Sequence, residues 1–268
     1  MMPELLAYRE DHPKPQQLLT ELFAFAYHNA LSCIFPVYIF AMLWVSHLIH
    51  IPGLHRYDLL LILCLAMQAI MYFTKLETWD EVKVITLFHL LGLGMEIFKV
   101  NHGCWSYPEE GLTKIAGVPL YSGFMYASVA SYICQSWRRF NLKMVNWPPV
   151  YLSLPLAIAI YLNFFTNYYI YDFRWALTAL ILIVFFRTKA YFINNGPQRN
   201  MPMPLAFLLI GLFIWFAENI ATFLGAWQYA YQHNGWQVVQ IQKLSSWALL
   251  VIVSVIIVAQ LKFAKDGP

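Results

Sequence analysis

The chain has 268 residues, of which 60% are hydrophobic, 18% aromatic and only 12% charged, and its formal net charge is +3. Soluble domains have about a quarter of their residues charged, so this composition excludes an ordinary water-soluble domain and favours folding in a lipid bilayer. A nucleic-acid-binding protein is also disfavoured, because the basic residues sit at the ends of apolar segments.

Apolar segments of about 20 residues, the length that crosses a bilayer core, follow one another along the chain. The first 20 residues are polar and contain three prolines, unlike a cleavable signal. Residues 18–30 are predicted to form a short interfacial helix or an extension of the first span. We predict eight membrane-spanning helices, near residues 31–50, 57–74, 83–100, 117–137, 147–166, 173–190, 203–224 and 244–262. The second and sixth are bounded by charges, so either can be short or tilted.

Lysine and arginine residues predict the orientation of these spans. For eight spans, twelve basic residues fall on one side and five on the other, namely Arg56, Lys99, Lys114, Arg174 and Lys243. Cytoplasmic loops carry the excess of basic residues. The sequence therefore predicts a protein of the cell membrane, the bacterial inner membrane, with both termini cytoplasmic.

An internal repeat divides the predicted spans into two halves. The segments Glu96–Tyr107 and Glu218–Tyr229 both read E-x6-G-x-W-x-Y, and P-V-Y, Y-D and T-K elements precede each of them in the same order. The fold class predicted is all-α: a polytopic transmembrane bundle of about eight helices in two four-helix repeats, residues 31–137 and 138–268, after an N-terminal segment, residues 1–30. Because four is an even number of spans, the second repeat starts on the same side of the membrane as the first. The two repeats therefore have the same orientation and are related by an axis along the membrane normal.

Each repeat places one glutamate inside the hydrocarbon, at equal depth. Gly92 and Gly211 share a helix face with Glu96 and Glu218, respectively, and glycines on such a face let another backbone approach closely. The glutamates are therefore predicted to point into the bundle. A charged side chain at the bilayer centre costs about 2.5–3.5 kcal/mol on insertion scales, and such residues usually mark functional sites. Glu96 and Glu218 are our candidate catalytic acid and base.

The alternative is that both glutamates are structural. Glu96 could pair with Lys99 at the i+3 position, and Glu218 could bond to Asn219 or Thr222. Further residues are predicted to line a cavity beside the glutamates: Trp105, Tyr107, Trp227, Tyr229, His89, Lys99, Asn219, Asp58 and Asp172. The Trp and Tyr pairs either belong to an interfacial aromatic belt or cover the cavity and stabilise a developing cation. The aspartates begin spans, where a helix N-terminus favours an anion.

Cofactor signals are absent from the sequence. Cys33, Cys64, Cys104 and Cys134 are far apart and form no C-x-x-C motif, so no disulfide is assigned. The eight histidines are scattered and lack the clustered motifs of membrane hydroxylases. No nucleotide-binding or nucleophile motif occurs, and we expect neither a metal nor another cofactor.

The two E-x6-G-x-W-x-Y elements, together with I-A-G-V-P-L at residues 115–120, carry a resemblance over nearly the whole chain. It resembles the YoaT-like bacterial integral membrane proteins, domain of unknown function family 817. It is more weakly similar to carotenoid hydratases and small membrane lycopene cyclases, in which a carboxylate is thought to protonate a polyene double bond. The positions that match this second family are Glu96, Trp105, Tyr107, Pro119 and Leu120, whereas Tyr121 and Ser122 replace the acidic pair of the cyclases.

These observations favour a membrane enzyme that acts on an apolar lipid or isoprenoid by carboxylic acid and base chemistry within the bilayer. The alternatives are a small proton-coupled transporter with the paired glutamates at its site, or a non-catalytic membrane scaffold. An enzyme or a transporter needs both glutamates to open onto one cavity, whereas a scaffold would have each satisfied by its own neighbours. The expected partners are the bilayer and a small lipid, without nucleic acid, and the oligomeric state stays open.

Overall fold

The computed structural model describes residues 15–194 and 198–266, and most of these are helical. The α-helices, in chain order, are α1 Pro15–Ser32, α2 Ile34–Val45, α3 Arg56–Phe73, α4 Trp79–Asn101, α5 Ser122–Arg139, α6 Val150–Thr166, α7 Arg174–Phe185, α8 Met203–Phe223 and α9 Lys243–Asp266. Helices α2 to α9 fall, one each, on the predicted spans, and α1 covers the segment predicted as an interfacial helix or an extension. Residues 1–14 of the predicted N-terminal segment lie outside the described residues.

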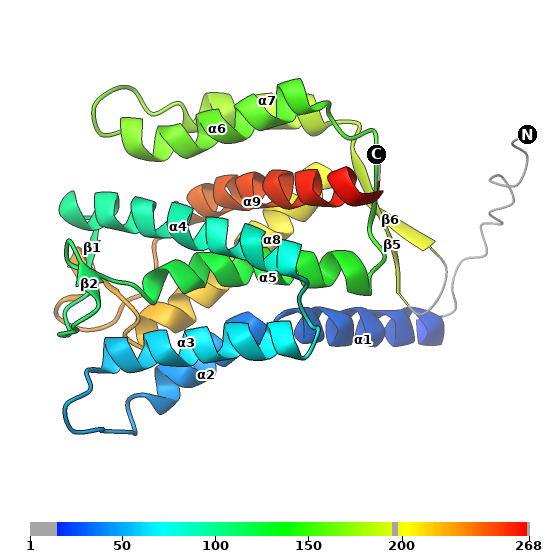
Figure 1. Cartoon of the computed structure of the whole chain (residues 1–268). Coiled ribbons are helices and arrows are strands. Elements are labelled where there is room, and N and C mark those ends of the chain that lie inside the picture. Colours follow the sequence, from blue (N-terminus) through cyan, green and yellow to red (C-terminus); the bar gives the residue numbers. More distant parts are fainter. Residues whose placement is uncertain (1–14, 195–197, 267–268) are drawn as a thin grey trace, which may run out of the picture.

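Helix α2 continues in the general direction of α1, and from α2 to α9 consecutive helices run in alternate directions between two ends of the bundle (Figure 1). At the end called here the site end, α4 finishes and α3, α7 and α9 begin; α1 begins and α9 finishes at the opposite end. Helix α5 is central and packs against α1, α2, α4 and α9. The predicted close backbone approach is confirmed at Gly211, where an added Cβ would lie 2.9 Å from the Cα atom of Ala248 in α9.

Short strands join the loops at both ends, so the prediction of a purely α-helical chain is incomplete. They are β1 Trp105–Ser106, β2 Lys114–Ile115, β3 Val118–Pro119, β4 Lys143–Val145, β5 Lys189–Ile193, β6 Gln198–Pro202 and β7 Gln228–Tyr229. Strand β2 pairs with β3, and β5 lies between β4 and β6. At the site end, β1 pairs antiparallel with β7, which sets Trp105 opposite Tyr229. The two repeated motifs therefore meet through their backbones.

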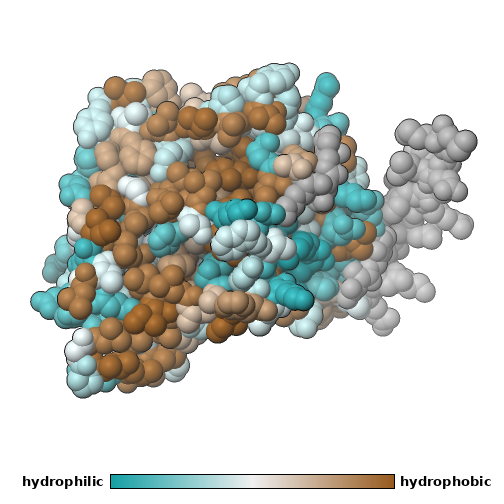
Figure 2. Space-filling view, viewed as in Figure 1, coloured by the Kyte–Doolittle hydropathy of each residue, from teal (hydrophilic) through white to brown (hydrophobic). Residues whose placement is uncertain are grey.

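The helices are compatible with a membrane protein. By length and composition, α3, α8 and residues Lys243–Ala264 of α9 could each cross a membrane, and a fourth span results if Leu19–Ser32 and Ile34–Val45, bent by 64°, count as one. Helices α6 and α7 are apolar but shorter. Large apolar side chains such as Phe73 and Ile183 are 79% and 73% exposed, and hydrophobic areas extend over much of the face in Figure 2. Monomeric soluble proteins rarely expose such large apolar patches.

Candidate functional site

The local backbone explains how each motif folds back on its own glutamate. Glu96 lies near the end of α4 and Glu218 near the end of α8, and both are 3% exposed. The motif glycines that follow these helices, Gly103 and Gly225, have φ angles of +69° and +66°. Glycine adopts this left-handed conformation without steric cost and commonly ends a helix with it. The chain therefore reverses there, and the next residues return beside the glutamate.

Glu96 accepts three hydrogen bonds from neutral aromatic donors. Its Oε1 atom accepts from the Tyr126 hydroxyl at 2.6 Å. Its Oε2 atom accepts from Trp105 Nε1 at 2.6 Å and from the Tyr107 hydroxyl at 2.8 Å. Both residues of the first W-x-Y element thus bind the glutamate of their own motif.

Glu218 repeats this arrangement with fewer donors. Its Oε1 atom accepts a hydrogen bond from the Tyr229 hydroxyl, and its Oε2 atom accepts one from Trp247 Nε1. Tyr229 follows Glu218 by 11 residues, as Tyr107 follows Glu96. Trp227 supplies no hydrogen bond to Glu218 among the contacts described, so the second carboxyl group has two donors where the first has three.

The donors of the two glutamates pack on one another. The rings of Trp105, a donor to Glu96, and Tyr229, a donor to Glu218, lie 5.9 Å apart between centroids. Tyr126 and Trp247, which also serve different glutamates, lie 6.4 Å apart. Each contact therefore joins one donor of each carboxyl group, and the two glutamates form a single interlocked site.

Both carboxyl groups open onto one apolar cavity of about 180 Å³. Its walls are mainly apolar side chains of α2, α5 and α8, and Trp105, Trp227 and Tyr229 lie at the site end. Two lining residues, Val37 of α2 and Phe213 of α8, are 57% and 67% exposed. The cavity thus reaches the outer apolar surface between these two helices.

Six of the nine residues predicted to line the cavity are not lining residues, namely Tyr107, His89, Lys99, Asn219, Asp58 and Asp172. His89 packs against Phe124, with ring centroids 4.5 Å apart. Asn219 binds backbone atoms of Trp215 and Val239. The side chain of Lys99 lies 4.4 Å from the ring centre of Tyr168 and forms no ion pair with Glu96. Tyr107 reaches Glu96 but is also not a lining residue. Sharing a helix face with a glutamate was therefore insufficient to place a side chain in the cavity.

The two predicted aspartates stabilise loops at the site end. Asp58, in the first turn of α3, accepts hydrogen bonds from the backbone amides of Leu112 and Thr113, both at 2.8 Å. Asp172 accepts from Asn163 and forms an ion pair with Arg174 at 3.3 Å. Both carboxylates are therefore occupied by neighbouring loop and side-chain donors.

Tyr126 and Trp247 are the site residues that the sequence reasoning missed. They follow Glu96 and Glu218 by 30 and 29 residues, on the helices α5 and α9 that come next in the chain. Extending the repeat register into those helices would have aligned them. Gly92 makes room for Tyr126, since a Cβ there would lie 2.4 Å from the tyrosine ring.

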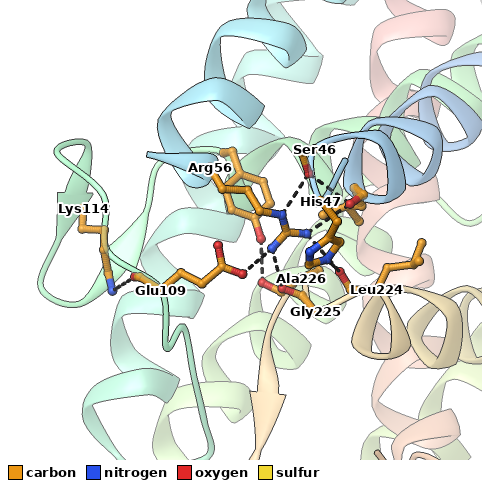
Figure 3. Close-up of polar contacts among 10 residues, drawn as sticks. Ser46, His47, Arg56, Glu109, Lys114, Leu224, Gly225 and Ala226 are labelled. Atoms are coloured by element: carbon orange, nitrogen blue, oxygen red, sulfur yellow. Dashed lines mark hydrogen bonds and ion pairs between the residues drawn. The ribbon is translucent and has the colours of Figure 1, made fainter. Parts of the chain in front are cut away.

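Arg56 connects the loops of the two halves at the site end (Figure 3). It donates to Glu109 at 2.5 Å and to Ser46 Oγ at 2.9 Å. It also donates to the carbonyl oxygens of Leu43, Leu224 and Gly225 at 3.2, 3.0 and 3.3 Å. The carbonyl groups of the α8 C-terminus therefore bind a cation from α3, which fixes the turn that leads to Trp227.

A second buried polar cluster lies at the opposite end of α4. Glu81 binds Lys262 at 2.7 Å and Arg138 at 3.3 Å, and its side chain is 2% exposed. The neighbouring Glu77, also 2% exposed, accepts hydrogen bonds from Gln68 and Ser131 but has no ion pair among the described contacts. Two adjacent buried glutamates thus differ in whether a cation compensates them.

Because, among the described contacts, only Glu81 is paired with cations, replacing Glu77 and replacing Glu81 by glutamine should have opposite effects on the free energy of unfolding. Burial raises the pKa of the Glu77 carboxyl, against the hydrogen bonds from Ser131 and Gln68. A raised folded pKa stabilises the protein fully below the ordinary glutamate pKa, and this contribution is lost as the pH rises through the folded value. In thermal unfolding of the solubilised protein, Glu77→Gln should therefore gain stability relative to wild type as the pH increases. Glu81→Gln leaves the Lys262 ammonium without its carboxylate partner, so it should lower the free energy of unfolding by about 3 kcal/mol at neutral pH. Equal effects of the two substitutions would contradict this assignment.

Within the described residues, no group of three or more His, Cys, Asp or Glu side chains could hold a metal ion. The four cysteines are free thiols.

Comparison with known proteins yields relatives without an assigned activity. The family model described as "Protein of unknown function (DUF817)" matches residues 21–255. The chain is 56% identical over 248 residues to the "Uncharacterized protein YoaT" of Bacillus subtilis (strain 168), covering 92% of this chain and 94% of that protein. No solved structure matches, and the weaker resemblance to carotenoid hydratases and cyclases is absent from these findings.

Proposed function

The chain belongs to the DUF817 family of proteins of unknown function, and we propose that it is an integral membrane enzyme acting on an apolar lipid or isoprenoid. The chemistry would be proton transfer by Glu96 and Glu218. The observation that carries this proposal is the shared cavity, which contains two buried carboxyl groups and opens between α2 and α8. An apolar chain could enter it sideways from a bilayer.

The proposal includes eight membrane crossings, with the site end on the non-cytoplasmic side. It is supported by the alternating helix directions (Figure 1) and by the exposed apolar side chains. Five basic residues were predicted on the side of the membrane with fewer positive charges. All five belong to elements at the site end, namely Arg56, Lys99, Lys114, Arg174 and Lys243. The parallel four-helix repeat is supported by the equal spacing of glutamate and tyrosine in the two motifs.

The unequal donor sets suggest different roles for the carboxyl groups. Two buried carboxyl groups that share a site are unfavourable when both are charged. From donor number we assign Glu96, with three donors, as the carboxylate and Glu218, with two, as the proton carrier; Lys243 is within electrostatic range of Glu218. Hydrogen bonds to the charged form favour that form.

A balanced reaction follows from these roles. The Glu218 carboxyl transfers its proton to one carbon of a substrate double bond, so that a C–H bond forms as the O–H bond breaks. The positive charge on the neighbouring carbon is stabilised by the Glu96 carboxylate and by the faces of Trp105 and Trp227. Glu96 then removes a proton from the adjacent carbon, which forms a new double bond without an oxidant or a reductant.

The transporter and scaffold alternatives fit less well. Each glutamate has its own donors, as a scaffold requires, but both open onto one cavity, which a scaffold does not need. Secondary transporters commonly bind substrate at interrupted helices, whereas α4 and α8 continue through Glu96 and Glu218. The continuous helices favour a rigid site.

Lipid analysis tests the enzyme proposal. Cells that produce the wild-type protein should contain an isoprenoid or lipid species that changes relative to cells without it. Glu96→Gln and Glu218→Gln should reduce that change by about 100-fold or more, the usual contribution of a general acid or base. Glu110→Gln serves as the control, because Glu110 is exposed in a site-end loop. An unchanged lipid profile with wild-type protein, or full activity of both core variants, would overturn the proposal.

A further inference from the structure

Three cationic side chains gather at the site end, from three different helices. Lys99 belongs to the last turn of α4, and Arg174 and Lys243 are the first residues of α7 and α9. Arg174 donates a hydrogen bond to Ser245 at 3.1 Å, two residues beyond Lys243. Lys99 is within electrostatic range of both other cations. The fold therefore concentrates positive charge from distant parts of the sequence.

The two lysines have aromatic neighbours but no hydrogen-bond acceptor. The ammonium group of Lys99 lies 4.4 Å from the ring centre of Tyr168. That of Lys243 lies 4.8 Å and 5.4 Å from the ring centres of Tyr229 and Trp105. Aromatic faces attract and orient a cation, but they leave its N–H groups without an acceptor. Among the ion pairs and hydrogen bonds of the described residues, neither ammonium group has a carboxylate or carbonyl partner.

Such an arrangement is energetically unfavourable without a ligand. Lys99 is only 8% exposed, and a buried ammonium without an acceptor loses solvation that the protein does not replace. Asp172 is already paired with Arg174, so it compensates one of the three positive charges. Glu218 is within electrostatic range of Lys243, so two positive charges remain when Glu218 holds its proton and one when it does not, which matches the charge of a phosphate dianion or monoanion.

We infer that Lys99, Arg174 and Lys243 form a binding site for a phosphate group. Arginine offers a planar donor pair that fits phosphate, and lysine supplies a compact charge with three donors. The site is distinct from the cavity, because Lys243 contacts Trp105 and Tyr229 but none of the three cations is a lining residue. It goes beyond the proposed enzyme activity and does not depend on it. The phosphate can come from a lipid headgroup or from a soluble phosphate or diphosphate.

Direct binding measurements on the purified full-length protein test this site. Inorganic phosphate and inorganic diphosphate are titrated in detergent, and phosphatidic acid is titrated in nanodiscs against phosphatidylcholine. The readouts are intrinsic tryptophan fluorescence, to which Trp105 beside Lys243 should contribute, and the melting temperature. Binding of the inorganic probes identifies a soluble ligand, binding of phosphatidic acid alone identifies a headgroup, and either result supports the site.

Matched variants decide whether the three cations are responsible. Lys99→Gln and Lys243→Gln should weaken phosphate binding about 10-fold or more, whereas Lys243→Arg should retain it. Lys143→Gln is the control, because Lys143 is exposed and belongs to strand β4, outside the site end. A melting temperature measured without phosphate identifies variants that fail to fold. Failure of every probe to bind wild-type protein, or equal binding by folded Lys243→Gln and Lys143→Gln, would overturn the inference.

Discussion

Replacing Arg56 with glutamine should destabilise the protein by about 2–3 kcal/mol, because a half-exposed partner, Glu109, and several carbonyl oxygens lose their hydrogen bonds to a charged donor. The Arg56 side chain is 10% exposed. A guanidinium has five N–H donors, and Arg56 makes five hydrogen bonds, to Ser46, Glu109 and the carbonyl oxygens of Leu43, Leu224 and Gly225. Glutamine supplies two donors and no charge, so at least three of these five hydrogen bonds would be lost, although Leu43 and Leu224 keep the donors Ser46 and His47.

The effect of Arg56→Gln should be concentrated at the site end. Because Arg56 binds the carbonyl groups that end α8, its loss should release the turn before Trp227 and β7. Hydrogen exchange should increase in residues 105–119 and 224–232 more than at β5 and β6. Arg187→Gln is the matched control, because Arg187 is exposed. Thermal unfolding that differs by less than 1 kcal/mol between the two variants would show that the Arg56 contacts contribute little.

The sequence predicted the positions of the helices well because hydropathy is a local property. Runs of apolar residues bounded by charges or proline specify where helices lie. The inward direction of the glutamates also followed from local spacing, since glycines on the same face mark close packing. Gly211 behaves as expected against Ala248.

The spacing of residues along a helix could not predict which side chains form hydrogen bonds with the two glutamates. Lys99 lies one turn from Glu96 and was a plausible ion-pair partner, but Tyr126 reaches Glu96 from α5. Likewise, Trp247 of α9, and neither Asn219 nor Thr222, binds the Glu218 side chain. Such contacts depend on how helices pack, and helical periodicity contains no information about which neighbour a given face meets.

The loop structure could not be predicted either, because it depends on contacts between segments far apart in the sequence. The pairing of β1 with β7 joins segments far apart in the sequence, and each strand is too short to show an alternating pattern. The five bonds of Arg56 likewise converge on segments from both halves of the chain. The sequence showed Arg56 only as a basic residue at the start of a span, where membrane topology explained it.

Replacing Gly92 with alanine should displace the Tyr126 side chain and thereby disturb the hydrogen bonds of Glu96. An added Cβ at Gly92 would lie 2.4 Å from the Cγ and Cδ2 atoms of Tyr126 and 2.7 Å from its Cβ atom. The conflict involves the base of the side chain and the near edge of its ring, so rotation of the hydroxyl end cannot relieve it. Inserting a group into a packed core usually costs about 1–3 kcal/mol. We expect Gly92→Ala to lower the free energy of unfolding by an amount near the upper end of this range, because the buried hydrogen bond from Tyr126 to Glu96 is also lost.

Gly94→Ala provides the matched control within the same helix. A Cβ at Gly94 meets only the Tyr161 hydroxyl at 3.8 Å, an ordinary contact. Alanine also favours an α-helix over glycine by about 1 kcal/mol, so Gly94→Ala should be neutral or stabilising. Pairing Gly92→Ala with Tyr126→Phe in a double-mutant cycle separates the steric effect from the lost hydrogen bond. If both glycine variants melt alike, then Tyr126 has room to move and Gly92 does not determine its position beside Glu96.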